Sequence, residues 1–450
     1  MYNFLYRHIL FPLHDRWLRK RNTIAYWKQA EKREWWSRPQ LEAYQLEALQ
    51  NVMSHAYNTC SYYTESWNKT GLIPETIQSL DDIQKFPLIS KEAFREHGSQ
   101  MQSSLPLKLY TKSTGGSSGE PLHFSLDKES NERRTAMMFR GYNWGGGAPG
   151  TKQLFIWGSH FSTAKQSTRL KHSLHALYER RKMLSCFDFT PQKMKEHLST
   201  HNQYRPDVII AYTNPLYEFA RFIKNENLTA FSPQSMIVGA EKLHDFQREL
   251  IEDVFQAPLF ETYGSREFML IGAECEQHTG LHLSIDNLLV EIVDNDGNPT
   301  PDGEEGNVVI TDLYNYGMPF IRYINGDRAI AGFEMCECGR GLPLLKKVTG
   351  RQLDILETPD GRKIPGEFFP HLMKEFKGIR RFQVLQSLLE KITIKLVIDD
   401  SFGETERAML LTEIIEVAGT EVEIDLQIVE EIPLTKAGKH RVVVREMSTS

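Results

Sequence analysis

Glycine and hydroxyl side chains are concentrated in residues 110–124, which read Tyr-Thr-Lys-Ser-Thr-Gly-Gly-Ser-Ser-Gly-Glu-Pro-Leu-His-Phe. Glycine lets a backbone approach a ligand closely, and the N–H and O–H groups of such a run can converge on an anion, which suits a polyphosphate. It is not a Walker A loop, because Gly119 is followed by Glu120 and Pro121 instead of lysine. From composition alone, a plain turn or linker is the alternative.

Three cysteines and a histidine have the chemistry of a metal site. Cys336 and Cys338 are separated by one residue and followed by a glycine, and Cys275 lies upstream with His278 and His282 close behind it. Three thiolates and one imidazole would bind Zn²⁺ tetrahedrally with no open position, so the site would be structural. We expect His282 as the fourth ligand and His278 as its alternate; buried free cysteines are the other interpretation.

Five further motifs follow the loop at 113–121. They read Gly239-Ala240-Glu241-Lys242, Tyr263-Gly264-Ser265-Arg266-Glu267, Arg322-Tyr323-Ile324-Asn325-Gly326-Asp327, Gly350-Arg351-Gln352-Leu353-Asp354 and Pro433-Leu434-Thr435-Lys436-Ala437-Gly438-Lys439. Each alone is unspecific, but their order resembles that of the AMP-forming acyl/aryl-CoA ligase superfamily of adenylating enzymes. Within it, the chain looks most similar to the branch of phenylacetate–CoA ligases, coenzyme F390 synthetase-like proteins and capsule-biosynthesis relatives.

The resemblance implies a site for Mg·ATP. The loop would bind the β and γ phosphates, and Glu267 would ligate Mg²⁺, for which one carboxylate plus phosphate oxygens is sufficient. Tyr263 would stack on the adenine and Asp327 would accept hydrogen bonds from both ribose hydroxyls. The nucleotide-binding residues implied in this way are Ser113, Thr114, Gly115, Gly116, Ser117, Ser118, Gly119, Gly239, Ala240, Glu241, Tyr263, Gly264, Asp327 and Arg351.

Two lysines are assigned by the same resemblance. Lys439 would bridge the carboxylate and the α-phosphate in the transition state of adenylation, and Lys436 would be its solvated neighbour. Many relatives carry a lysine after the proline of the loop, but this chain has Leu122, so we expect Lys112 to supply part of that charge. Asp354 would be the hinge about which a small C-terminal domain rotates between adenylation and thioester formation.

The acid would bind near Tyr212, Thr213 and Asn214, with Gly264 and Ser265 on the other side of its pocket. The acid itself is not specified, and the acceptor is CoA, a carrier protein or an amine, with CoA preferred. One alternative function is acyl transfer to an amine or hydroxyl in surface-polysaccharide assembly. Another is a non-catalytic nucleotide-binding scaffold, which Leu122 favours and the joint presence of the other motif residues disfavours.

The composition is that of an ordinary globular chain of 450 residues, with 40% hydrophobic and 25% charged residues. A formal net charge of −6 provides no general basic field and disfavours a nucleic-acid binder. Neither a membrane-spanning apolar run nor a signal peptide is evident, so we expect a cytoplasmic protein. Residues 1–40 are aromatic and basic: they form a helix packed on its own domain or one that lies on an anionic membrane surface.

The patterning of the chain predicts an α/β fold with two domains, 1–353 and 354–450. Apolar runs at 153–157, 208–211 and 236–238 alternate with helical stretches, which favours buried parallel strands. A strand, an Asn-Asp-Gly turn and a strand between 288 and 311 predict an antiparallel or barrel-like part. Alternation at 392–398, a helical stripe at 404–418 and alternation at 422–428 predict a small α+β domain, and helical spacing predicts a helix at 41–56.

Overall fold

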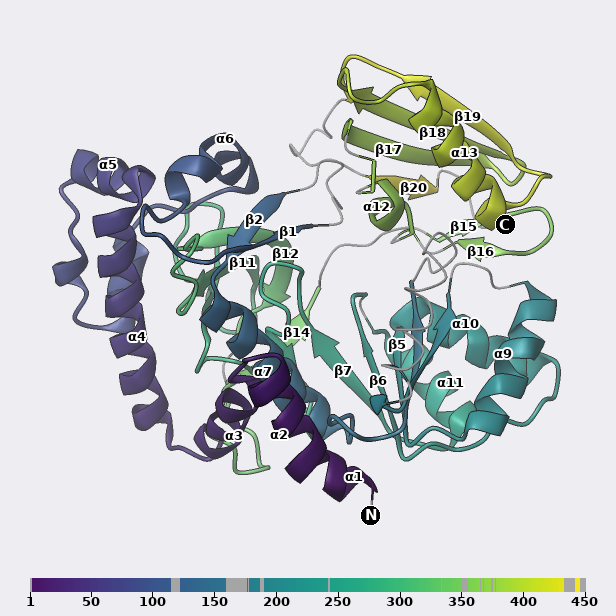
Figure 1. Ribbon diagram of the computed structural model, residues 1–450, viewed down its shortest axis with the longest axis horizontal. Helices are drawn as coiled ribbons and strands as arrows, with labels where there is room; N and C mark the ends of the chain where they lie inside the picture. The colour runs from purple at the N-terminus through teal and green to yellow at the C-terminus, as the bar shows by residue number, and fades with distance from the viewer. Residues whose placement is uncertain are drawn as a thin grey trace.

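The computed structural model has a mixed α/β architecture, as predicted (Figure 1). It describes residues 2–114, 122–158, 176, 178–186, 190–241, 243–332, 334–349, 355–364, 366, 368–373, 375–376, 378–432 and 442–445. In these residues the structure has an N-terminal helical part, a central mixed sheet, an antiparallel sheet and a C-terminal α+β unit. No described helix combines the length and the apolar character that crossing a bilayer requires.

An eight-stranded sheet with the order β13-β9-β8-β7-β6-β5-β3-β4 forms the centre of the molecule. Its strands are β3 (Gln153–Trp157), β4 (Arg181–Ser185), β5 (Val208–Tyr212), β6 (Ser235–Gly239), β7 (Leu259–Tyr263), β8 (Gly272–Ala273), β9 (Leu281–Leu283) and β13 (Leu344–Leu345). The run from β4 to β7 is parallel and the run from β7 to β13 is antiparallel. β5 and β6 are buried at every position, because parallel strands are covered on both faces.

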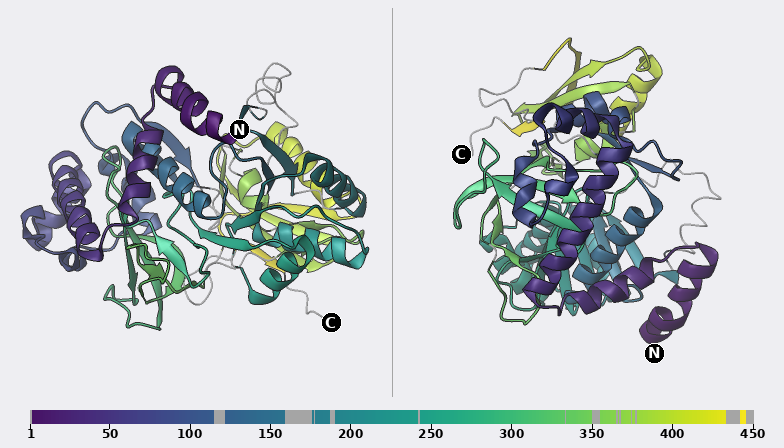
Figure 2. Two further views of the ribbon diagram at one scale, coloured as in Figure 1. Left: turned by 90° about the horizontal axis from the view of Figure 1, so that it is seen from below. Right: turned by 90° about the vertical axis from the view of Figure 1, so that its left-hand side faces the viewer.

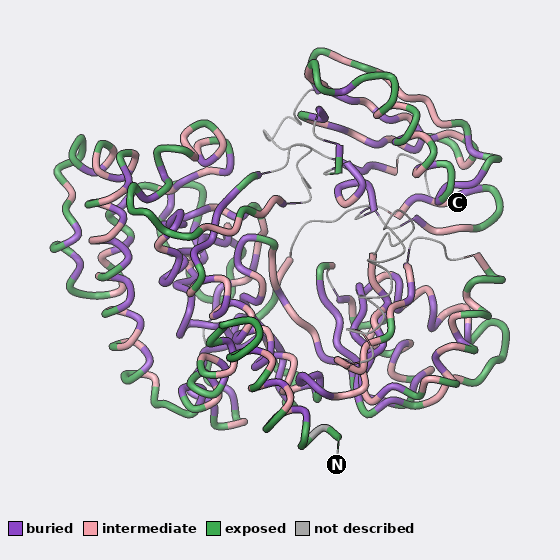
Figure 3. Tube along the Cα trace, viewed as in Figure 1, coloured by how far each residue is buried: buried purple, intermediate pink, exposed green. Residues whose placement is uncertain are grey.

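Helices cover the two faces of this sheet, and its central strands are buried along the trace (Figure 3). On one face, α9 (Pro191–Tyr204), α10 (Thr213–Asn225) and α11 (Asp245–Phe255) share a core with Ile209 and Ala211 of β5. On the other face, Ile210 and Phe260 pack with Tyr142 of α7 (Lys128–Trp144). Successive side chains of an apolar strand therefore point to opposite faces of the sheet and pack in two different cores.

An antiparallel sheet lies beside the central one, in the order β10-β11-β12-β14. Its strands are β10 (Leu288–Val293), β11 (Glu305–Asp312), β12 (Tyr323–Ile330) and β14 (Lys347–Val348). The predicted turn between β10 and β11 is confirmed: Gly297 has φ +88°, and Asp294 Oδ1 accepts from the N–H groups of Asp296 and Asn298 at 2.9 Å each. A separate hairpin consists of β1 (Tyr110–Ser113) and β2 (His123–Leu126).

The N-terminal part is helical. Residues 2–18 run as α1 (Tyr2–Leu5), a π-helical segment Tyr6–Leu10, α2 (Phe11–Leu13) and a second π-helical segment His14–Leu18. They are followed by α3 (Thr23–Arg33), α4 (Arg38–Thr59), α5 (Ser61–Thr70), the 3₁₀ helices Pro74–Thr76 and Leu80–Lys85, and α6 (Lys91–Met101). The helix predicted at 41–56 is confirmed within α4. Buried Asp286 joins this part to α7, since it accepts from Arg33 Nε at 3.1 Å and from Arg140 Nη1 at 2.9 Å.

The C-terminal unit is α+β, as predicted. It contains β15 (Leu356–Glu357), β16 (Lys363–Ile364), α12 (Phe368–Met373), β17 (Ile379–Leu388), β18 (Lys391–Ile398), α13 (Glu404–Ala418), β19 (Glu423–Ile428) and β20 (Val443–Arg445). Its sheet has the order β19-β18-β17-β20, and α13 forms the crossover between the parallel strands β18 and β19. The alternation at 392–396 places Ile392, Ile394 and Leu396 in the core, and α13 ends before Gly419 at φ +85°.

Candidate nucleotide site and metal centre

Three parallel strands end at one edge of the central sheet, and a predicted motif begins at the end of each. β5 ends at Tyr212, β6 at Gly239 and β7 at Tyr263. Because neighbouring parallel strands place their carboxyl ends together, segments 212–214, 239–241 and 263–267 are side by side (Figure 1). This edge is the usual ligand site of open α/β sheets. The structure thus brings the segments predicted for the acid and for the adenine to one place.

Glu241, which follows β6, is hydrogen-bonded to the first turn of α10, the helix that directly follows β5. Its Oε2 atom accepts from the Asn214 N–H at 2.7 Å, and its backbone carbonyl accepts from Thr213 Oγ1 at 3.1 Å. Burial raises the pKa of Glu241. The preceding Ala240 adopts φ +68°, and a Cβ at Gly239 would lie 2.5 Å from Thr262 Oγ1. This motif therefore fixes the start of α10 and also lies at the sheet edge.

Asp327 of β12 forms one hydrogen-bonded unit with Tyr263 of β7. The tyrosine hydroxyl donates to Asp327 Oδ2 at 3.0 Å and accepts from Asn325 Nδ2 at 2.8 Å. Asn325 also donates to Asp327 Oδ2 at 2.9 Å and accepts from the Asp327 N–H at 2.9 Å. The residues predicted for adenine and ribose are therefore brought together, and Asn325, to which the motif gave no role, orients both.

Glu267 lies among buried side chains beside a buried cation. It is 6% exposed, and Tyr323 of β12 donates its hydroxyl to Glu267 Oε1 at 3.3 Å. Arg134 of α7, 4% exposed, donates to the Arg266 carbonyl, while its Nε and Nη1 atoms have no hydrogen-bond partner within the described ranges. Burial lowers the pKa of Arg134 to about 10, although Asp312 and Glu267 act in the opposite direction. Sequence reasoning missed Arg134, because a single helical arginine forms no motif.

The predicted phosphate loop starts at the closed end of the β1–β2 hairpin. The Thr114 N–H donates to the Leu122 carbonyl, and the Leu122 N–H donates to Thr114 Oγ1, both at 2.9 Å. Leu122 is fully buried in an apolar cluster with Phe124 and Leu126. A lysine at position 122 would therefore bury a charge, which gives a physical reason for the leucine.

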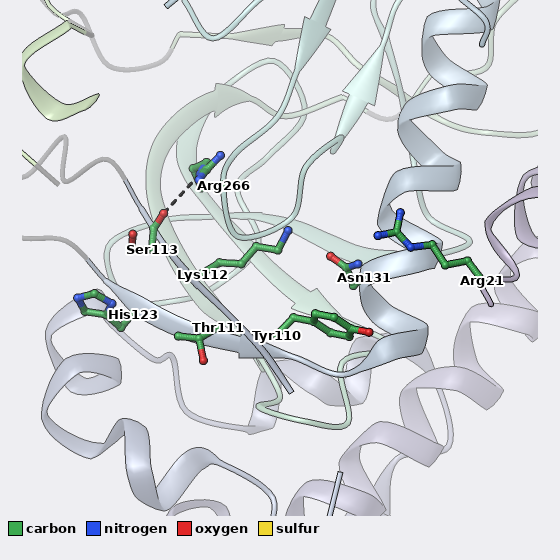
Figure 4. A pocket seen from close by; sticks show the side chains of 8 residues that line it. All are labelled: Arg21, Tyr110, Thr111, Lys112, Ser113, His123, Asn131 and Arg266. Atoms are coloured by element: carbon green, nitrogen blue, oxygen red, sulfur yellow. Dashed lines mark hydrogen bonds between the residues drawn. The ribbon is translucent and has the colours of Figure 1, made fainter. Parts of the chain in front are cut away.

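A basic pocket of about 700 Å³ adjoins β1 and the start of β2 (Figure 4). Its lining residues are Arg21, Tyr110, Thr111, Lys112, Ser113, His123, Asn131 and Arg266. Figure 4 shows Lys112 and Arg21 pointing toward Asn131 from opposite sides, and Arg266 Nε donates to the Ser113 carbonyl at 3.4 Å. Burial, and then the charges of Arg134, Arg266 and Arg21, lower the pKa of Lys112 to about 8. The described lining has three strongly basic side chains and no acidic one, so it favours an anion.

Tyr212 connects the sheet edge to the C-terminal unit. Its hydroxyl is 3.0 Å from His371 Nε2 of α12, and its ring centroid is 4.0 Å from that of Trp157 at the end of β3. On the opposite side, Gly264 is required by packing, since a Cβ there would lie 1.9 Å from the Met269 carbonyl oxygen. Trp157 and His371, which the sequence did not single out, thus contact a residue predicted for the acid pocket.

The four predicted metal ligands are brought together. One ligand atom from each of Cys275, His282, Cys336 and Cys338 lies within 4.8 Å of the other three. The Sγ atoms of Cys275 and Cys336 are 3.7 Å apart, and Cys338 Sγ is 3.4 Å from His282 Nε2. His282 Nδ1 lies 2.9 Å from the Leu342 carbonyl, which leaves Nε2 directed at the thiols. The donor set and its spacing fit a tetrahedral zinc ion.

The alternate ligand His278 is not part of this cluster. Its Nδ1 atom lies 3.2 Å from Glu274 Oε2 and 3.5 Å from Arg248 Nη1. His278 is only three residues after Cys275 and ends the turn that begins there, with φ +52°. His282 is in β9 and faces the thiols. The structure therefore groups His282, and not the alternate His278, with the three cysteines.

Several predicted residues lie outside the described part of the chain. They are Gly115, Gly116, Ser117, Ser118 and Gly119 of the loop, Arg351, the hinge residue Asp354, and Lys439.

Comparison with known proteins finds relatives that are named as phenylacetate-coenzyme A ligases or as CapK. Residues 356–446 match the family model described as the CapK C-terminal domain. The chain is 23% identical over 391 residues to a phenylacetate-coenzyme A ligase of Thermus thermophilus, covering 84% of this chain and 86% of the relative. It is 22% identical over 421 residues to Protein CapK of Staphylococcus aureus, covering 90% and 89%.

Among solved structures, 2-hydroxyisobutyryl-CoA ligase shares the fold over most of its length. Its postadenylation state in complex with R3-HIB-AMP has a TM-score of 0.60 at 18% identity and covers 92% of each chain. The same ligase in complex with 2-HIB-AMP and CoA, in its thioesterification state, has a TM-score of 0.59 at 19% identity and covers 90% of each chain. This likeness extends through both the central sheet and the C-terminal unit.

Proposed function

The chain belongs to the AMP-forming, adenylate-forming ligase superfamily, in the branch of phenylacetate–CoA ligases and CapK, and we propose from this premise that it activates a carboxylic acid as an acyl-adenylate. Mg·ATP is the co-substrate, pyrophosphate leaves, and the acyl group passes to CoA. The observation that carries the proposal is the meeting of segments 212–214, 239–241 and 263–267 with Asp327 at one sheet edge.

We assign roles to the described residues on the basis of their places. Glu267, a buried carboxylate beside the sheet edge, would hold Mg²⁺, which neutralises phosphate charge when bound. Tyr263, Asn325 and Asp327 form a polar unit suited to a nucleoside, and Tyr212 with Trp157 supports an acid pocket with an aromatic wall. Asp354 as hinge, the boundary between 1–353 and 354–450, and Lys439 as the catalytic cation belong to the same proposal.

A second acceptor class is part of the proposal, because residues 356–446 match the C-terminal domain of CapK. In that case, the acyl group would pass to an amine or hydroxyl, as in surface-polysaccharide assembly. ATP as co-substrate and the reduced thiols of the cysteine cluster support a cytoplasmic location for either version.

The test is carboxylate-dependent ATP–pyrophosphate exchange with pooled aryl, alkyl and amino acids. We expect exchange with one pool, followed by acyl transfer when CoA is added. Exchange that leads to an amide or ester, but not to a thioester, would select the second acceptor class. Absence of exchange with every pool, together with measurable ATP binding, would favour the nucleotide-binding scaffold.

We propose that Lys112 supplies the positive charge at the phosphate loop that a lysine at position 122 would otherwise provide. Its amino group shares a basic pocket with Arg266 and Arg21 at the base of the phosphate loop. Since the pKa of Lys112 is lowered to about 8, the side chain loses its positive charge as the pH rises through that value. The KM for ATP should therefore rise between about pH 7 and pH 9, the range of roughly one pH unit on either side of the pKa of Lys112.

The variant Lys112→Met should have a KM for ATP that is already raised about tenfold at pH 7 and does not rise further, as expected for the loss of one charged contact. The matched control is Lys108→Met, because Lys108 is exposed four residues earlier. Steady-state kinetics across this pH range measures both. A rise in KM with pH that persists unchanged in Lys112→Met would contradict the assignment.

For the cysteine cluster we propose a structural zinc ion, ligated by Cys275, His282, Cys336 and Cys338. Elemental analysis of protein purified without chelator should give about one zinc per chain, since the donor set is complete without water. Cys338→Ser should lower that content and the Tm together, because the metal contributes to folding.

The control for the cluster is Cys60→Ser, a change at a buried cysteine elsewhere in the chain. It should leave the zinc content unchanged even if it lowers the Tm. Metal-free protein with the Tm of the purified sample would count against the zinc site.

A further inference from the structure

The N-terminal helix, residues 2–18, is attached to the protein by one face. Its π-helical segments widen the turns, so residues four or five apart share a face. Tyr6, Phe11 and Asp15 form the inner row and are buried. The Tyr6 ring centroid lies 5.0 Å from that of Tyr178, Phe11 makes an edge contact with Phe139 of α7 at 5.7 Å, and Asp15 accepts from an N–H at the start of α3. The interpretation as a packed helix thus accounts for this face.

The opposite face of the same helix is apolar and exposed. Its outer row contains Phe4, Ile9, Leu13, Trp17 and Leu18, which are 69%, 47%, 51%, 76% and 77% exposed. Of the nineteen exposed large hydrophobic residues in the described chain, seven lie within residues 2–18. Single exposed apolar side chains are ordinary, but a row of them along one helix at the periphery of the molecule indicates an interaction surface (Figure 2).

The exposed charges around this row are basic. Outside the basic pocket, which Arg21 lines, the exposed arginines and lysines of residues 1–40 are Arg16, Arg19, Lys20, Lys28 and Lys32. The acidic residues of 1–40 are engaged internally: Asp15 is buried, Glu31 pairs with Arg7 at 2.7 Å, and Glu34 pairs with Arg340 at 3.3 Å. A basic surface on a chain of net charge −6 selects an anionic partner.

We propose that residues 2–18 bind the surface of an anionic lipid bilayer, with the outer row inserted at the headgroup boundary and the basic side chains among the headgroups. A row one helix wide presents no groove or socket that would require a partner of complementary shape, and a bilayer requires none. Aromatic and aliphatic side chains beside Lys and Arg are the composition of interfacial helices. Trp17, near the end of the row, has the side chain that prefers the membrane–water boundary. This surface is independent of the ligase chemistry.

The experiment is co-sedimentation of the full-length protein with vesicles of phosphatidylcholine alone and of equimolar phosphatidylcholine and phosphatidylglycerol. We expect binding to the mixed vesicles that is at least about tenfold stronger than to the neutral ones and that weakens with salt. The double variant Leu13→Asn/Trp17→Asn should lose about tenfold or more in partitioning, because two inserted apolar side chains are removed. The matched control Leu228→Asn/Phe246→Asn changes exposed apolar residues on the helical face of the central sheet and should bind like wild type.

A second variant, Arg19→Gln/Lys20→Gln, keeps the apolar row and should lose the preference for phosphatidylglycerol. Variants with the Tm of wild type are folded. We expect this result because the substituted side chains are exposed. The proposal is overturned by wild-type protein that binds neither vesicle, or by outer-row variants that partition like wild type. It is also overturned if the protein forms a lipid-free dimer that Leu13→Asn/Trp17→Asn dissociates, because a second copy would then cover the row.

Discussion

Glu267→Gln should reduce the rate of ATP–pyrophosphate exchange by about 100-fold or more, the scale of losing one preorganised electrostatic contact in a transition state. Glutamine keeps the volume and an oxygen that can accept from the Tyr323 hydroxyl at the position of Oε1, so the fold should survive. It removes the negative charge that would hold Mg²⁺ and that faces the buried Arg134. The loss should be partly restored by higher Mg²⁺ concentrations, because the residual oxygen ligand is neutral.

The measurement is a Mg²⁺ titration of exchange in wild type, Glu267→Gln and the control Glu304→Gln. Glu304 is exposed on the segment between β10 and β11, and its substitution should leave exchange unaltered. A Glu267→Gln enzyme with wild-type exchange and an unshifted Mg²⁺ requirement would remove Glu267 from the site.

Lys439→Ala should lower adenylation by about 100-fold or more, because the residue is assigned to charge that accumulates in the transition state. The effect should be confined to the first half-reaction. Acyl transfer from a supplied acyl-adenylate should stay near the wild-type rate, since the C-terminal domain presents another face to the site in that step.

Lys436→Ala is the matched control, three residues away in the same motif. Pyrophosphate exchange and single-turnover acyl transfer, measured on both variants, separate the two half-reactions. Equal losses in the two variants would indicate a general role for the loop, and unchanged exchange in Lys439→Ala would show that the assignment is wrong.

The spacing of apolar residues was sufficient to predict helices and strands whose local sequence defines them. The stripe at 404–418 coincides with α13, because its apolar spacing and the following Gly419 define a helix and its end. The alternation at 422–428 gave β19, yet Ile428 is 53% exposed there, since β19 is at the edge of its sheet. Whether a strand lies at the edge or in the middle of a sheet depends on its pairing with other strands, and the alternation of apolar residues does not predict that pairing.

The candidate site was predictable where its chemistry dictates residue types and spacing, and less so where a single side chain comes from an unrelated segment. The cysteine cluster was found because metal ligation dictates residue types and spacing. The contribution of Arg21 to the basic pocket was not, because it comes from the N-terminal segment, far from Lys112 and Arg266 in sequence. Arg322 of the Arg322–Asp327 motif is structural: it binds Glu291 at 2.9 Å and the Phe86 carbonyl at 2.7 Å, at a backbone φ of +45°.

The cysteine cluster also has a consequence for the unfolded chain. Cys275 and Cys336 are 61 residues apart, and β10, β11 and β12, with Asp327, lie between them. A metal bridging the two would close this segment into a loop and so reduce the conformational entropy of the unfolded state. By analogy with a covalent cross-link, closing a loop of this length is worth about 4 kcal/mol. The strand that carries Asp327 would thus lie inside the loop that the metal closes.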